Sequence, residues 1–290
     1  LALLLHSTNL STFGEACLCP CRLSGMGLDE KGEAMHKSKG NVVYPGPMFQ
    51  AYGADAFRLW GAAEVKLGSN YRFSEDRVKG AALFITKLWN IARFISSFTR
   101  VTEDYELAAL DRLILGKLNQ VIKECVSGYD QLDTFVPANA IRAFTWNIFA
   151  DHYIEAVKPR AYNKDGEFGE KLQSGAWYTL HACLETILKL LAPICPFITE
   201  AVWRGLYSSE SIHIQPFPGE KPEWESDLIK LTPQFMDFNA LIWKYKKEKG
   251  IALSRKLAAT VYAPMELENF KEDLKAMHGI RELYFFEPTD

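Results

Sequence analysis

The chain has 290 residues, 48% of them hydrophobic and 24% charged, with a formal net charge of -3 at pH 7. This composition is typical of a globular protein with a large core, and it excludes a collagen, a low-complexity disordered chain and a cysteine-dense disulfide scaffold. The mildly acidic balance also excludes a protein that is basic over its whole surface, so any site for a polyanion has to be local.

The six cysteines follow no regular spacing, which indicates free thiols and a cytoplasmic protein. Three of them, Cys17, Cys19 and Cys21, lie close together, but without the two-residue gap and the second ligand pair that are usual at zinc sites. We therefore predict no metal site. The apolar start, residues 1–5, is far shorter than a membrane span, so no membrane association is expected. The absence of an initial Met favours a piece of a longer polypeptide.

The first elements along the chain are short. Residues 23–28 have the pattern of a strand that enters a hairpin turn at 29–32. From 48 to 63 the apolar residues fall on one helical face, with a break at Gly53. Ser74 then stands at the expected N-cap of a long helix.

Helices predominate over the rest of the chain. Apolar residues at steps of three and four predict helices over 75–95, 110–125, 140–152, 177–191 and 197–206, followed by a proline-rich linker over 208–224 and a helix over 228–249. The pattern then changes to strand, helix and strand over 257–262, 266–277 and 281–286. The sequence thus predicts a mainly α protein with a small α/β unit at its end.

The basic, glycine-bounded loop 35–41 is the segment of greatest chemical interest. Its lysines, Lys37 and Lys39, are of the type that contact phosphate oxygens as point charges. A Walker phosphate-binding loop is excluded, because Lys37 stands where a glycine is required when counting from Gly32, and an acid replaces the lysine when counting from Gly27. By spacing alone, a solvated charged turn remains the simpler interpretation.

Residues 25–43 as a whole nevertheless resemble the KMSKS signature region of class I aminoacyl-tRNA synthetases. Further segments agree with this resemblance. Residues 52–60 are similar to the segment that follows the signature loop in the synthetases for valine, isoleucine, leucine and methionine. Within that group, the segments 67–75 and 151–160 look most like archaeal-type valyl-tRNA synthetases. The segment 193–200, together with Trp203, resembles the late helical motif of the same enzymes.

The resemblance implies ATP, with Mg²⁺, as a substrate, because these enzymes join ATP and an amino acid into an aminoacyl-adenylate and then transfer the amino acid to tRNA. Lys37 matches the second signature lysine and would stabilise the leaving pyrophosphate, while Ser38 matches the final serine. Ala34 replaces the first lysine and His36 replaces the first serine. The other loop residues expected near ATP are Met35, His36 and Lys39.

The resemblance also implies the domain order. We expect the end of a Rossmann-type catalytic domain over 1–105, a helical anticodon-binding domain over 106–222, and a helix with a small α/β appendage over 223–290. The implied partners are tRNA(Val), ATP and valine, in a monomeric protein. No His-x-Gly-His motif is present, so we expect the chain to be inactive in aminoacylation by itself. The alternatives are a piece of an isoleucyl-tRNA synthetase and a non-catalytic helical interaction module of the same ancestry.

A nucleic-acid surface is predicted near the end of the chain. Its candidates are the basic residues Lys244, Lys246, Lys247, Lys249, Arg255 and Lys256. A solvated helix end explains this patch nearly as well. The aromatic residues of the helices are expected to pack in the core rather than to stack on bases, and His152 is expected to be a core residue. Asp151 and Glu155 are assigned to salt links rather than to acid–base catalysis.

Overall fold

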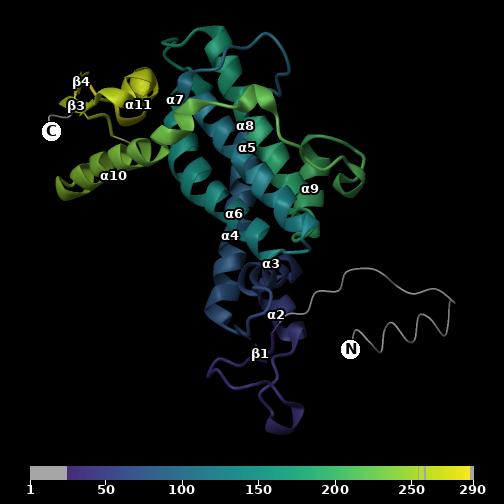
Figure 1. The fold of residues 1–290 in the computed structure, drawn as a ribbon. Helices are drawn as coiled ribbons and strands as arrows, with labels where there is room; N and C mark the ends of the chain where they lie inside the picture. Colours follow the sequence, from purple (N-terminus) through teal and green to yellow (C-terminus); the bar gives the residue numbers. More distant parts are fainter. Residues whose placement is uncertain (1–24, 254, 258, 288–290) are drawn as a thin grey trace.

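The computed structural model of the chain describes residues 25–253, 255–257 and 259–287. The cluster of Cys17, Cys19 and Cys21 and the first two residues of the predicted strand lie outside them. Figure 1 shows three parts of the molecule: a loop-rich unit with β1, α2 and α3 at one end, a bundle of long helices next to it, and α10 with the α11 unit at the side of the bundle, near its far end. None of the helices within the described residues is long and apolar enough to cross a membrane.

The predicted hairpin exists only as a single antiparallel bridge between Leu28 and Ala34. The main partner of β1 (Gly27–Leu28) is instead the parallel strand β2 (Tyr71–Arg72), which the sequence analysis did not predict. The two segments approach closely at Gly25, where a Cβ atom would lie 2.2 Å from the carbonyl oxygen of Ser69. A side chain at this position would therefore separate the strands.

Helices α2 (Pro45–Tyr52) and α3 (Ala54–Glu64) confirm the predicted helical face and its break. Gly53 joins them at φ 84° and ψ 155°, a conformation that residues with a side chain rarely adopt. Helix α4 (Glu75–Ile95) begins after Ser74, as predicted. The side chain of Ser74 makes no capping hydrogen bond, and the backbone N–H of Glu75 donates to Glu30 Oε1 instead, at 3.2 Å.

The bundle contains α4 together with α5 (Ala109–Asp130), α8 (Glu170–Leu191), α9 (Pro196–Leu206) and one long composite helix. The composite helix begins with α6 (Phe135–Ala143), continues as a π-helix over Phe144–Tyr153, and ends with α7 (Ile154–Tyr162). It confirms the helix predicted over 140–152 and extends it in both directions. In a π-helix the backbone hydrogen bonds join residues five apart, and the rings of Phe144 and Phe149, which have this spacing, stack with 6.0 Å between their centroids.

The expected core residues of the bundle are buried. Phe144, Phe149, Tyr153 and Trp203 are at most 4% exposed, and their rings pack against other side chains. Of the six cysteines, the described ones, Cys125, Cys183 and Cys195, are free thiols, as predicted. Burial raises the pKa of all three thiols, to about 12 for Cys125, and this favours their protonated form.

The proline-rich linker lies against the bundle and confirms the prediction of a wrapped segment. Trp224 anchors it with only 3% exposure, and Gly116 in α5 leaves room for it, because a Cβ atom there would lie 2.7 Å from the side chain of Ile229. Helix α10 (Thr232–Glu248) follows. The end of the described chain forms β3 (Thr260–Pro264), a 3₁₀ turn, α11 (Lys271–His278) and β4 (Glu282–Phe286), with the two strands parallel, as the predicted strand–helix–strand unit requires.

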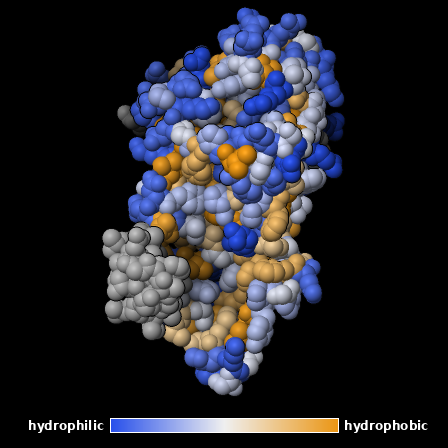
Figure 2. All heavy atoms as spheres, turned by 90° about the vertical axis from the view of Figure 1, so that its right-hand side faces the viewer, coloured by the Kyte–Doolittle hydropathy of each residue, from blue (hydrophilic) through white to orange (hydrophobic). Residues whose placement is uncertain are grey.

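The polar and apolar parts of the surface are unevenly distributed. Figure 2 shows hydrophilic residues over the upper part of one face and more apolar ones in its lower half. Large exposed apolar side chains of the loop-rich unit include Met26, Tyr44 and Phe49, which are 53%, 60% and 43% exposed. This unit therefore has a less complete core of its own than the bundle.

Candidate nucleotide loop and nucleic-acid surface

The signature-like loop forms a compact turn. Lys37–Lys39 make one turn of 3₁₀ helix, which ends at Gly40 with φ 67° in the left-handed region. The backbone N–H of Gly40 donates to the carbonyl oxygen of Lys37 at 3.2 Å. Met35 is half-buried and packs against the core, so the turn stands on an apolar anchor.

Asn41 fixes the shape of this loop. Its side-chain amide donates to Asp29 Oδ2 at 2.8 Å and to the carbonyl oxygen of Ala34 at 3.1 Å, and its Oδ1 accepts the N–H of His36 at 2.9 Å. Asp29 Oδ1 in turn accepts two backbone N–H groups, from residues 31 and 33. These hydrogen bonds, that from Asn41 first, lower the pKa of Asp29. Asn41 lies within the signature-like loop, but nothing in the sequence pattern indicated this role for it or for Asp29.

The loop places the side chains of Lys37 and Ser38 in solvent. Lys37 makes no ion pair or side-chain hydrogen bond with any residue that the structure describes. Lys39 differs, because its ammonium lies 3.5 Å from the carboxylate of Glu33. Lys37 is therefore the lysine of the turn that can offer a full, uncompensated charge to an anion.

The loop is tied to the rest of the molecule through Glu30. The guanidinium of Arg72 donates to the carbonyl oxygen of Glu30, with Nε at 2.8 Å. The carboxylate of Glu30 accepts the N–H of Glu75, the first residue of α4. The position of the loop thus depends on β2 and on the start of α4.

The motif segments 52–60 and 193–200 lie against each other. Asp55, 7% exposed, accepts backbone N–H groups from Ile198 at 2.7 Å and from Phe197 at 3.3 Å at the beginning of α9. The guanidinium of Arg58 donates to the carbonyl oxygens of Ile194 at 2.8 Å and Pro193 at 3.0 Å. A carboxylate is favoured at a helix N-terminus, so this contact joins the loop-rich unit to the bundle. Both segments were recognisable in the sequence, whereas their contact depends on the tertiary fold.

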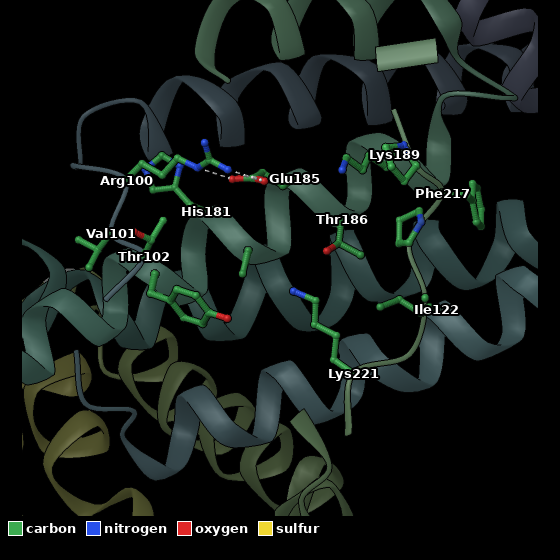
Figure 3. A pocket seen from close by; sticks show the side chains of 15 residues that line it. Arg100, Val101, Thr102, Ile122, His181, Glu185, Thr186, Lys189, Phe217 and Lys221 are labelled. Carbon is green, nitrogen blue, oxygen red and sulfur yellow. Dashed lines mark hydrogen bonds and ion pairs between the residues drawn. The ribbon is translucent and has the colours of Figure 1, made fainter. Parts of the chain in front are cut away.

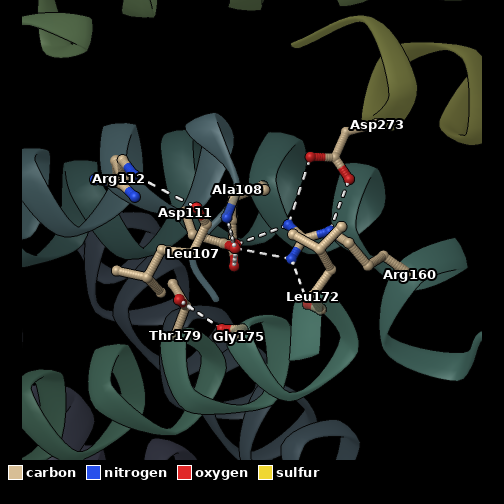
Figure 4. Close-up of polar contacts among 10 residues, drawn as sticks. Leu107, Ala108, Asp111, Arg112, Arg160, Leu172, Gly175, Thr179 and Asp273 are labelled. Carbon is tan, nitrogen blue, oxygen red and sulfur yellow. Dashed lines mark hydrogen bonds and ion pairs between the residues drawn. The ribbon is translucent and has the colours of Figure 1, made fainter. Parts of the chain in front are cut away.

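The motif segment 151–160 ends at Arg160, which belongs to a buried ion cluster shown in Figure 4. Arg160 is 1% exposed, and its guanidinium lies 2.8 Å from Asp111 of α5 and 3.0 Å from Asp273 of α11. Asp111 also accepts the hydroxyl of Tyr153 at 2.6 Å. Burial opposes the charge of Arg160, but the two carboxylates outweigh it and raise its pKa well above the ordinary value. The cluster holds the bundle and the α11 unit together.

The predicted basic patch is present in part. Lys244, Lys247 and Lys249 of α10 and Arg255 and Lys256 beyond it are exposed. Lys246 must be removed from it, because its side chain is fully buried. Its ammonium donates to the carbonyl oxygens of Leu253, Arg255 and His278, at 2.9 to 3.1 Å. The chain folds back over Lys246, which therefore cannot reach a phosphate.

The remaining candidates have the structural roles that were expected. His152 is 8% exposed and receives a hydrogen bond from Asn239 at Nδ1, at 3.2 Å. Glu155 pairs with Lys158 at 2.5 Å, and Asp151 pairs with Lys87 at 2.5 Å. In the part of the chain that the structure describes, no group of three or more His, Cys, Asp or Glu side chains is arranged to hold a metal ion.

Two family models match the chain. The anticodon-binding domain of tRNA ligase matches residues 111–262, and the class I tRNA synthetases (I, L, M and V) match residues 6–74. The valine–tRNA ligase of Pyrobaculum aerophilum is 41% identical over 271 residues, which are 93% of this chain and 34% of that protein. The valine–tRNA ligase of Aeropyrum pernix is 42% identical over 262 residues, 89% of this chain and 32% of that protein. The chain spans about a third of the length of these relatives.

Solved structures share the fold. The Agrobacterium radiobacter K84 LeuRS–tRNA–LeuAMS ternary complex has a TM-score of 0.56 at 20% identity, over 70% of this chain and 24% of that one. The Mycobacterium tuberculosis methionyl-tRNA synthetase with methionyl-adenylate has a TM-score of 0.52 at 20% identity, over 67% and 41%. These likenesses confirm the mainly α fold class. The anticodon-binding match covers more than half of the residues of this chain. The chain therefore belongs to the class I tRNA ligases with this anticodon-binding domain.

Proposed function

We propose that this chain is the C-terminal part of a cytoplasmic valine–tRNA ligase. It binds tRNA(Val) through its helical domain and contributes the ATP-binding loop to valine activation. The observation that supports this most is the similarity to the P. aerophilum valine–tRNA ligase along 93% of the chain. The proposed division remains a catalytic end over 1–105, an anticodon-binding domain over 106–222 and an appendage over 223–290, in a monomer.

In the proposed reaction, Lys37 stabilises the pyrophosphate that leaves ATP. Negative charge increases on this group as the bond to the α-phosphate breaks, and a cation placed there lowers the energy of the transition state. The ammonium of Lys37 is suited to this role, because it is exposed and has no ion-pair partner among the residues that the structure describes. Ser38 adds a hydroxyl, and Met35, His36 and Lys39 complete the contacts of the loop. Mg²⁺ bound to ATP would neutralise phosphate charge and order the phosphates.

In the proposed tRNA complex, the exposed residues of the basic patch contact the phosphate backbone. These are Lys244, Lys247, Lys249, Arg255 and Lys256. Such contacts add affinity without reading the sequence, so recognition of the anticodon has to come from other residues of the helical domain.

Filter binding of the 290-residue chain to purified tRNAs at one fixed, low salt concentration tests the proposal. We expect tRNA(Val) to bind at least about tenfold more tightly than tRNAs of unrelated specificity, and this preference to be lost when its anticodon bases are changed. Equal affinities for all tRNAs would contradict the proposal. A preference for tRNA(Ile) would point to the isoleucine enzyme instead.

A further inference from the structure

A cavity of about 310 Å³ opens on the side of the bundle, away from the signature loop. Its walls come from α8, from Ile122 of α5, from the segment that follows α4, and from the proline-rich linker. Figure 3 shows Arg100, Lys189 and Lys221 around it, with Thr186 between the two lysines. None of these residues has a part in the function proposed above.

The cavity has an excess of positive charge. It is lined by Arg100, Lys189 and Lys221, and its one lining carboxylate, Glu185, already binds Arg100, with 2.7 Å between Oε1 and Nε. Neither lysine makes an ion pair or a side-chain hydrogen bond with any residue in the described ranges. The hydroxyl of Thr186 likewise has no hydrogen-bond partner among those residues. Two cations and a hydroxyl donor are thus available to a ligand.

Both lysines are held in place by buried aromatic rings. The ammonium of Lys221 lies 4.1 Å from the ring centroid of Trp224, and that of Lys189 lies 5.0 Å from the ring centroid of Trp203. The backbone of Lys221 is fixed as well, because it exchanges two hydrogen bonds with the side chain of Asn119, at 2.8 and 3.2 Å. Cation–π contacts of this kind orient an ammonium group without neutralising it.

The far wall is rigid and uncharged. His181 Nε2 lies 3.1 Å from the carbonyl oxygen of Phe98, and its Nδ1 lies 3.0 Å from the hydroxyl of Tyr207. A carbonyl oxygen only accepts, so Nε2 bears the proton and Nδ1 accepts from Tyr207. Burial lowers the pKa of His181 and favours this neutral form.

The lysines also repel each other. Burial lowers the pKa of Lys189, and the positive charges of Lys221 and Arg100 lower it further, against the pull of Glu185. An anion between them would remove this repulsion. A doubly charged oxyanion gains most, because it can accept from both ammonium groups and from a hydroxyl at once.

We propose that this cavity is a binding site for a phosphate group, held by Lys189, Lys221 and the hydroxyl of Thr186. The phosphate is either free, as pyrophosphate, or part of an RNA backbone. As a pyrophosphate site it goes beyond the proposed function, because it lies outside the signature loop. As a site for a backbone phosphate it rests on the proposed tRNA binding and locates one contact of it on the helical domain.

Isothermal titration of the 290-residue chain with inorganic pyrophosphate at low ionic strength tests the site. The cavity variant is Lys189→Met with Lys221→Met. The matched control is Lys79→Met with Lys164→Met, which removes the same charge from two exposed lysines without ion pairs in the described structure. We expect pyrophosphate affinity to fall at least about tenfold in the cavity variant and to stay unchanged in the control.

Filter binding of one tRNA to the same variants distinguishes free pyrophosphate from a phosphate of an RNA backbone as the ligand. A loss of tRNA affinity in the cavity variant but not in the control, without pyrophosphate binding, assigns the site to a backbone phosphate. Equal behaviour of the two variants toward both ligands overturns the proposal. If the double variant does not fold, Lys221→Met alone, at an exposed position, replaces it. A chain without preference for tRNA(Val) contradicts the proposed function but leaves the pyrophosphate result interpretable.

Discussion

Lys37 stands at the tip of a turn whose shape is set by other residues. Asn41 and Asp29 order the backbone, while the lysine itself remains in solvent. The resemblance pointed to Lys37 because the signature is local in sequence. The density of basic residues near the end of the chain pointed to Lys246 as a phosphate contact, and this was wrong, because Lys246 is buried by residues that follow it in the chain. Local pattern predicts charge, whereas burial depends on the tertiary fold.

Replacement of Lys37 by Ala, in the complete ligase that contains this chain, should slow valine-dependent ATP–pyrophosphate exchange by about a hundredfold. A transition-state donor removed from a developing oxyanion typically has an effect of this size. The matched control is Lys66→Ala, which removes an exposed lysine from the same unit. An exchange rate equal to that of the control would leave Lys37 without a catalytic role.

Arg160 presents the opposite case, a charge that is structurally necessary. Arg160→Met leaves the carboxylates of Asp111 and Asp273 buried without their partner. We expect the free energy of unfolding to fall by about 3 to 5 kcal/mol, as for other buried pairs that lose one member. Urea denaturation followed by circular dichroism measures this. Arg112→Met, at an exposed position one residue after Asp111, should change it by less than about 0.5 kcal/mol.

At the scale of elements, the apolar periodicity predicted every long helix, because a buried stripe at steps of three and four is a property of the sequence itself. Two elements could not be predicted in this way. Strand β2 has only two residues, too few to show an alternation, and it is defined by its pairing with β1. The π-helix over Phe144–Tyr153 differs from an α-helix by its hydrogen bonds rather than by its composition.

Helix α10 is joined to its neighbours by two histidines that have to be neutral. Asn239 donates to His152 Nδ1 at 3.2 Å, and its Oδ1 accepts from His278 Nε2 at 2.9 Å. Burial, followed by the charge of Lys246, lowers the pKa of His278 to about 3, and burial lowers that of His152. Protons therefore bind the unfolded chain in preference to the folded one between the ordinary histidine pKa of 6.5 and about 3.

The free energy of unfolding should therefore decrease as the pH falls below about 6.5, by up to about 1.4 kcal/mol per pH unit for each such histidine. Urea titrations at pH 7.5, 6.0 and 5.0 measure the slope. His278→Gln, which retains a donor but cannot titrate, should show a shallower slope than the parent chain. His213→Gln, at an exposed position, is the control. Parallel slopes for all three proteins would contradict this account.

At the scale of the whole molecule, the candidate sites lie far apart. The signature loop belongs to the unit at one end, whereas the basic patch belongs to α10 and the segment after it, which project from the side of the distant part of the bundle (Figure 1). Composition could only indicate that a polyanion site had to be local. It could not indicate how many such regions there were, since the cavity at Lys189 combines residues from four separate segments. Only the fold brings these segments together.

The contact between α3 and α9 also sets an order of events during synthesis on the ribosome. Asp55 and Arg58 emerge well over a hundred residues before their partners at 193–198. Until those partners are available, the Asp55 carboxylate has no helix end to cap, and α3 cannot complete its burial. The loop-rich unit is synthesised early but has to mature late. Its exposed apolar side chains make this interval the one in which the nascent chain most needs protection from aggregation.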